Sequence, residues 1–197
     1  MNKPESLNNI RIVLCQTSHP GNIGSTARAM KTMGLSDLRL VMPRKFPHAE
    51  ANTMAAGADE VLANATVCAS LQEALIGCGL VIGITARKRQ LSHAMLSARE
   101  AAAEAIAVAG NQQVALVFGT EMSGLSNEEL DQCQLLATIP ANPESSSLNL
   151  ASAVQVLAYE LWQTAASPAI DADRSAPLAG HDEVEGSAIP TLLGTKT

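Results

Sequence analysis

The sequence predicts an α/β fold in which a mostly parallel sheet carries helices on both faces. Five short, mainly apolar segments have the length and composition of buried strands, and helical patterns separate them. Strands that alternate with helices pair in parallel, and apolar strands are typical of a sheet covered on both faces. Hydrophobic residues make up 47% of the chain but aromatic residues only 2%, so aliphatic side chains and methionine must fill the core.

The predicted elements follow one another in a regular order. Each strand is a short apolar run bounded by Gly, Pro or polar residues, and the helices are the segments between these runs. The strands are Ile10–Thr17, Asp37–Pro43, Gly79–Ala86, Gln113–Gly119 and Gln134–Pro140, with a weaker candidate around Val67. The helices are Ile23–Met33, Ala49–Leu62, Leu71–Ile76, Ser97–Ala109, Asn127–Cys133 and a long last one from Leu148.

Residues 1–166 fit one domain, and residues 167–197 have a different character. This last segment is rich in Ala, Ser, Pro, Gly and acidic residues without helical or strand periodicity, which predicts a linker or a disordered tail. It holds five acidic residues against Arg174 and Lys196, so half of the net charge of -6 lies there.

The negative net charge argues against nucleic-acid binding through bulk charge. Basic residues nevertheless cluster ahead of the tail, so a local basic surface for a polyanion stays open beside the plainer alternative of solvated charged faces. That plainer alternative is the better interpretation for Arg44 and Lys45. The other clusters are Arg28 with Lys31, and Arg87-Lys88-Arg89.

Several classes of protein and site are not indicated. No apolar run reaches membrane-spanning length, and the first residues lack the basic-then-apolar order of a signal peptide, so we expect a cytosolic protein. The four histidines are scattered, and no metal site is indicated. The cysteines lack ligand spacing and lie in or beside apolar segments, which favours buried reduced thiols. They are Cys15, Cys68, Cys78 and Cys133.

Polar loops follow four of the predicted strands. Ligands of open parallel sheets gather at the carboxyl ends of the strands, so these loops together predict one site. It is not a dinucleotide or triphosphate site, because the first loop has GxxG rather than GxGxxG and the chain has no GxxxxGK[ST] motif. The loops are "SHPGNIGSTAR", "ARKRQLSHAM", "GTEMSGLS" and "ANPESSSLN".

The polar segment before the last helix has two interpretations. Pro143 turns the chain, and any of Ser145, Ser146 or Ser147 can cap the following helix, which is a purely structural role. Alternatively the segment is a ligand loop, because free amides and hydroxyls at a helix start suit a polar ligand.

Three stretches in order carry a family resemblance. They resemble the three motifs of the SpoU branch of the SPOUT RNA 2'-O-methyltransferases. From Ile10 to Trp162 the chain is similar to the bacterial TrmJ type, which methylates the tRNA ribose of cytidine or uridine at nucleotide 32, in the anticodon loop. The stretches are "GNIGSTARAMKTMG", "LVFGTEMSGLSNEEL" and "IPANPESSSLNLASAVQV".

The resemblance implies a SPOUT-type α/β knot, in which the C-terminal part of the catalytic domain forms a trefoil knot. It implies S-adenosylmethionine (SAM) as the cofactor without a metal, tRNA as the substrate, and a homodimer whose two subunits build each active site. The implied cofactor-binding residues are Thr85, Ala86, Gly119, Glu121, Gly124, Ile139, Ser147 and Leu148. The residues implied to face the ribose are Asn22, Arg28, Ser147 and Asn149.

Arg28 is the expected charged group of this site. A guanidinium stays protonated at all ordinary pH values, so we expect a clamp on the ribose oxygen and a phosphate rather than a general base. Ser147 and Asn149 are expected to orient the substrate through hydrogen bonds. Glu121 is expected either to complement the sulfonium of SAM or to fix its loop.

The last helix is apolar on nearly every face, which a dimer would explain. We expect one face to contact the sheet and another to contact a partner subunit. The sheet-facing residues are Leu150, Val154, Leu157 and Leu161, and the partner-facing residues are Ala151, Ala158 and Trp162.

Two departures from the family pattern bear on RNA binding. Thr120 and Met122 stand where such proteins usually carry basic residues, and the tail replaces their C-terminal helical extension, so we expect weak tRNA binding. The alternatives to this activity are 2'-O-methylation of another RNA, such as rRNA or another tRNA site, and a non-catalytic RNA-binding protein. Retention of Arg28, Ser147 and Asn149 together favours an enzyme.

Overall fold

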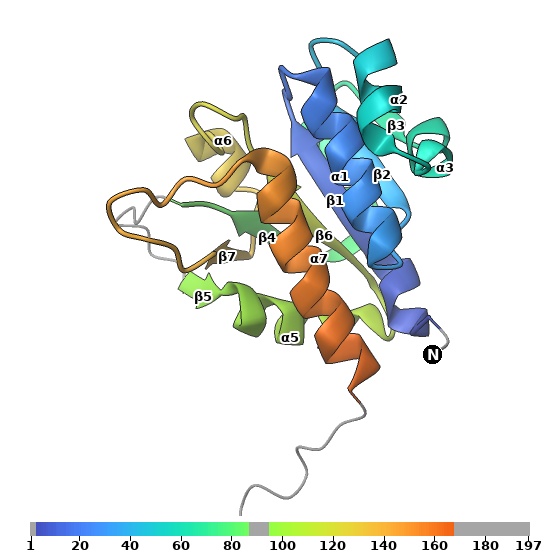
Figure 1. The fold of residues 1–197 in the computed structure, drawn as a ribbon. Coiled ribbons are helices and arrows are strands. Elements are labelled where there is room, and N and C mark those ends of the chain that lie inside the picture. Colours follow the sequence, from blue (N-terminus) through green and yellow to red (C-terminus); the bar gives the residue numbers. More distant parts are fainter. Residues whose placement is uncertain (1–2, 87–94, 168–197) are drawn as a thin grey trace, which may run out of the picture.

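The computed structural model describes residues 3–86 and 95–167, and in these residues seven strands form one sheet with parallel neighbours (Figure 1). The strands are β1 (Ile10–Cys15), β2 (Asp37–Val41), β3 (Thr66–Cys68), β4 (Cys78–Ile84), β5 (Met95–Ser97), β6 (Gln113–Phe118) and β7 (Leu135–Thr138). Their order across the sheet is β3-β2-β1-β6-β4-β7-β5. The mostly parallel sheet is therefore as predicted.

Helices cover both faces of the sheet, which confirms the predicted α/β class. Side chains alternate along β1, so Ile12 and Leu14 enter the larger core, with α1, α5 and α7, while Val13 and Cys15 enter a smaller core with α4 and α6. The helices are a 3-10 turn η1 (Glu5–Asn9), α1 (Pro20–Thr32), α2 (Ala49–Ala55), α3 (Asp59–Ala63), α4 (Leu71–Ala74), α5 (Ala98–Ala109), α6 (Asn127–Leu130) and α7 (Leu150–Ala166).

Helix α7 packs against both α1 and α5 of its own chain, and Figure 1 shows it beside α1. Its four predicted sheet-facing residues are buried, as expected. The prediction that Ala151 and Ala158 face a partner subunit is wrong, because both are buried within this chain and Ala158 completely so. Trp162 is partly buried against the same core. The helix is apolar on several faces because its own chain covers several of them.

Other differences from the predicted elements are local. The predicted helix Ala49–Leu62 is two helices, since Ala56 and Gly57 both take positive φ values, of 45° and 88°, and end α2. The weak strand candidate around Val67 is confirmed as β3, while the short β5 and η1 were not predicted. Gly24, in the first polar loop of the prediction, lets α2 pack closely on α1, because a Cβ there would collide with the backbone carbonyl of Ala51.

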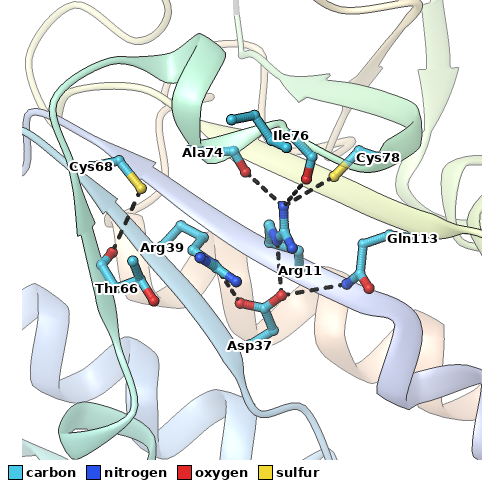
Figure 2. Close-up of polar contacts among 9 residues, drawn as sticks. All are labelled: Arg11, Asp37, Arg39, Thr66, Cys68, Ala74, Ile76, Cys78 and Gln113. Carbon is cyan, nitrogen blue, oxygen red and sulfur yellow. Dashed lines mark hydrogen bonds and ion pairs between the residues drawn. The ribbon is translucent and has the colours of Figure 1, made fainter.

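A polar cluster lies at the amino ends of the central strands, centred on the largely buried Arg11 (Figure 2). Arg11 and Asp37 are register partners on β1 and β2, and Arg11 Nε donates to Asp37 Oδ2 at 2.8 Å. Arg11 Nη1 also donates to the carbonyl oxygens of Ala74 and Ile76, at 2.8 and 3.1 Å. The guanidinium therefore ties the strand pair to the turn that leads into β4.

Asp37 has further partners in the same cluster (Figure 2). Its other carboxylate oxygen accepts from Arg39 Nε at 2.7 Å, and Gln113 Nε2 donates to Oδ2 at 3.4 Å. The buried charge of Arg11 is thus paired and hydrogen-bonded, as a charge inside a fold must be.

Some predictions fall outside the described residues. The basic run at residues 87–89 lies there, as does the predicted tail from residue 168 onward. The domain limits and the trefoil knot stay predictions.

Candidate active site

A cavity of about 320 Å³ opens at the carboxyl end of the sheet, where the chain leaves β4, β6 and β7. Its floor is apolar and includes Ile84, Phe118 and Leu150. The structure brings every predicted cofactor-binding residue to this one cavity. These are Thr85 and Ala86 after β4, Gly119, Glu121 and Gly124 after β6, and Ile139, Ser147 and Leu148 after β7.

The loop after β6 is a closed turn. Thr120 and Gly124 exchange two backbone hydrogen bonds of 3.2 and 2.9 Å, and the Thr120 and Ser123 hydroxyls lie 2.7 Å apart. Gly124 has a φ of 68°, which suits glycine. A Cβ on Gly119 would overlap the backbone of Gly124. The turn therefore requires glycine at position 119, because a side chain there would keep the turn beside the cavity from closing.

The positions of the serines before α7 distinguish a helix cap from a ligand loop. Asn149 is the N-cap of α7, and its Oδ1 accepts from the amides of Ala151 and Ser152 at 3.0 and 3.4 Å. The serines are thus not the cap, and Ser146 and Ser147 line the cavity instead. This placement favours the ligand-loop interpretation.

Two asparagines join the loops that surround the cavity. Asn149 Nδ2 donates to Asn22 Oδ1 at 2.9 Å, and Asn22 Nδ2 donates to Glu121 Oε1 at 3.0 Å. Asn22 lies in the first turn of α1, so the chain of hydrogen bonds runs from α7 through α1 to the turn after β6. Two of the predicted ribose-facing residues are therefore in contact.

Glu121 accepts further hydrogen bonds from the loop after β1. The donors are the backbone amides of Ser18 and His19 and the Ser18 hydroxyl, at 3.0 to 3.2 Å. Burial alone raises the pKa of the Glu121 carboxyl, but these amides, Asn22 and the residue's own amide outweigh it and lower the pKa from 4.5 to about 2. Its contribution to stability is complete above about pH 4.5 and is lost only as the pH falls through about 2.

Ser18 and His19 were not among the predicted site residues. A signal for them exists in the sequence, since His19 starts a helix and Pro20 follows it, yet no Asp, Asn, Ser or Thr stands at the cap position. A helix start without its own cap needs an acceptor from elsewhere in the fold.

Arg28 lies on the exposed surface of α1, one and a half turns after Asn22. It does not line the cavity, and its side chain makes no hydrogen bond or ion pair in the described part of the chain. Asn22 and Asn149 do not line the cavity either, so Ser147 alone of the four predicted ribose-facing residues lies at it. The basic residue Lys31, in contrast, is already engaged, since its Nζ donates to the Gly57 carbonyl at 2.7 Å.

Residues 3–86 and 95–167 contain neither a metal-ligand cluster nor a membrane-spanning helix. No group of three or more His, Cys, Asp or Glu side chains there has an arrangement that could hold a metal ion. No helix in the same residues has the length and apolar character needed to cross a bilayer.

The family model of the SpoU rRNA Methylase family matches residues 9–159. The chain belongs to this family. The match extends from the start of β1 into α7 and so includes all the residues that build the cavity. The predicted resemblance to the SpoU branch is confirmed.

Two proteins that resemble this chain are named as tRNA methyltransferases. The chain is 51% identical over 185 residues to the tRNA (cytidine/uridine-2'-O-)-methyltransferase TrmJ of Yersinia enterocolitica, covering 91% of this chain and 72% of the relative. It is 57% identical over 155 residues to the protein of that name from Escherichia coli K12, covering 79% of this chain and 63% of the relative. The matches thus span only part of each relative's length.

A solved structure in the same group shares the fold. It is a probable methylase family protein from Haemophilus influenzae Rd KW20, with a TM-score of 0.78 and 49% identity over 81% of this chain and 67% of that chain. The fold of this chain is therefore similar to that of a solved methylase family protein.

Proposed function

We propose that this chain transfers the methyl group of SAM to a ribose 2'-hydroxyl of tRNA. The observation that carries the proposal is the convergence on one cavity of all eight residues expected to hold SAM. The names of the Yersinia and Escherichia relatives support tRNA as the substrate class. On the resemblance to the TrmJ type, we propose cytidine or uridine at nucleotide 32, and a cytoplasmic site of action.

The lining of the cavity fits SAM. Its volume of about 320 Å³ lies within the range of roughly 300–1,000 Å³ typical of small-molecule sites. The apolar lining residues suit the adenine base of SAM, while the Ser147 hydroxyl and the backbone of Gly119 suit its polar groups. SAM, when bound, supplies an electrophilic methyl group on a sulfonium.

The protein's own part in this reaction is positioning and charge stabilisation. Holding the hydroxyl in line with the methyl group can contribute up to roughly 7–11 kcal/mol. Ser147, at the cavity, and the Asn22–Asn149 pair can orient the ribose through hydrogen bonds. The guanidinium of Arg28 can stabilise the negative charge that develops on the ribose oxygen and hold an adjacent phosphate.

The exposed position of Arg28 supports a shared site. Because Arg28 lines no part of the cavity of its own chain, we propose that it serves the cavity of a second subunit in a homodimer. Sedimentation at micromolar concentration tests this assembly, and a monomer there would contradict it.

The function is tested by measuring binding and transfer on one preparation. We expect calorimetry to show SAM binding and no NAD binding, and labelled SAM to transfer its methyl group to bulk tRNA. Mass spectrometry of the methylated nucleoside and its position then identifies the target. Transfer to rRNA alone would favour the other RNA substrate, and SAM binding without transfer to any RNA would favour a non-catalytic RNA-binding protein.

Substitution of Gly119 by alanine should weaken SAM binding at least tenfold. The added Cβ overlaps the backbone of Gly124, so the turn must open on the side that lines the cavity. The matched control is Gly110→Ala, because Gly110 has helical dihedrals and its Cβ would meet only the Ala107 carbonyl oxygen, at an ordinary contact distance of 4.0 Å. Calorimetry with SAM on both variants checks the result, and equal affinities would show that the closed turn does not hold the cofactor.

A further inference from the structure

The carboxylate of Glu121 is fully occupied within the protein. Its Oε1 accepts from the amides of Ser18 and His19 and from Asn22 Nδ2, and its Oε2 accepts from the amide and the hydroxyl of Ser18. A carboxylate has about four lone-pair sites, and these contacts use them. Although Glu121 lines the cavity, its carboxylate has no acceptor left for a ligand.

This carboxylate also lies beside the start of a helix. His19 is the N-cap of α1, and its side chain makes no capping hydrogen bond. Glu121, more than a hundred residues later in the chain, accepts from the amides of Ser18 and His19, the two residues before the first helical residue. The helix start favours a negative charge, which agrees with the lowered pKa of Glu121.

The hydrogen bonds of Asn22 and Asn149 determine the orientation of each side-chain amide. An ionised carboxylate only accepts, so the NH₂ group of Asn22 must face Glu121 and its oxygen must face Asn149. At the other end, the α7 amides only donate, so Asn149 must turn its oxygen to them and its NH₂ to Asn22. Within residues 3–86 and 95–167, each NH₂ group uses one N–H and leaves the other for a further acceptor.

We infer that Glu121 is a positioning residue, which acts through Asn22 and Asn149 to present their remaining N–H groups to the ribose. The inference rests on the proposed function, because the ribose is the acceptor that it names. It replaces the expectation that Glu121 binds the cofactor. Glu121 thereby links the turn that lines the SAM cavity to the groups that orient the second substrate.

The test is Glu121→Gln, which keeps the size of the side chain but adds donors where only acceptors fit. We expect single-turnover methyl transfer to bulk tRNA to fall at least tenfold, while the Kd for SAM changes less than threefold. The matched control is Glu128→Gln, an exposed glutamate on α6, which should change neither quantity.

A double substitution distinguishes action through Asn22 from a separate role. If Glu121 acts through Asn22, the double variant Glu121→Gln/Asn22→Ala should transfer the methyl group no more slowly than the slower single variant. Either substitution alone already breaks the same chain of hydrogen bonds, so the second adds no further loss. Independent roles would make the two losses multiply. Asn149→Asp breaks the same chain from its other end while keeping a good N-cap, and should also slow transfer with SAM affinity retained.

The outcomes separate this inference from the proposed function. Wild-type turnover in Glu121→Gln, multiplied losses in the double variant, or a loss of SAM affinity greater than tenfold would overturn the positioning role. The last result would return Glu121 to the cofactor. Wild-type protein that transfers no methyl group to any RNA would refute the proposed function, and the inference with it. If Glu121→Gln does not fold, as shown by its melting curve, Glu121→Asp takes its place, because it keeps the charge but shortens the reach of the carboxylate to Asn22.

Discussion

Substitution of Arg28 by lysine is expected to lower methyl transfer about a hundredfold, on the scale of removing one preorganised oxyanion donor. Lysine keeps the charge but not the planar fork that can hold an oxygen and a phosphate together. Arg28 is exposed and has no partner among the described residues, so stability should change by less than about 0.5 kcal/mol. Single-turnover transfer to saturating bulk tRNA, beside SAM calorimetry, measures the effect.

The control for this experiment is Arg44→Lys. Arg44 is also an exposed arginine, on the segment after β2, and the sequence favours a solvated role for it. We expect its substitution to leave transfer within about twofold, as for an isolated surface change. Near wild-type turnover in Arg28→Lys would remove Arg28 from the mechanism, and a loss of SAM binding would assign it to the cofactor site or the fold.

Substitution of Arg11 by methionine should destabilise the protein by about 3 kcal/mol, the lower end of the effect of breaking a buried ion pair. The change leaves the carbonyls of Ala74 and Ile76 without this donor and removes one partner from Asp37. We expect a loss at the lower end of that range because Arg39 and Gln113 still contact Asp37 in the variant. Urea denaturation followed by circular dichroism gives the free energy of unfolding.

A second arginine in an ion pair provides the matched control. Arg99 pairs with Glu160 at 3.2 Å, but its side chain is 82% exposed. Exposed pairs contribute less than about 1 kcal/mol, so Arg99→Met should have a small effect. If both variants lost the same free energy of unfolding, burial would not make the Arg11 ion pair more important for stability than the exposed Arg99 pair.

Much of the fold could be predicted from the sequence, because strand and helix segments leave clear apolar patterns. The order of the strands could not, since alternation of strands and helices does not say where β6 and β7 enter the sheet. The break between α2 and α3 was missed although Gly57 is a local signal for a helix end, because Ala56 before it, which also takes the left-handed conformation, is a good helix former. The apolar pattern continues across that position.

The cavity residues came from the family motifs, and the structure places all of them together. The partners that hold those motifs in place were harder to find. Arg11 is one such residue: a lone arginine in an apolar strand requires a partner, but the sequence does not identify Asp37 on the neighbouring strand. Ser18 and His19 act largely through backbone amides, which every residue has, so residue identity alone did not single them out.

The order of the strands also bears on how the chain folds while a ribosome makes it. β2 pairs with both β1 and β3, so these three strands can associate as soon as they emerge. β4 pairs with β6 and β7, and β5 pairs with β7, so both must wait for strands that are made later. The end of β4 at Ile84 and the end of β7 at Thr138 are 54 residues apart. At roughly 5–20 residues per second, one edge of β4 stays unpaired for roughly 3–11 seconds. An added apolar residue in β4 would therefore raise the risk of aggregation on the ribosome even where the finished sheet would accept it.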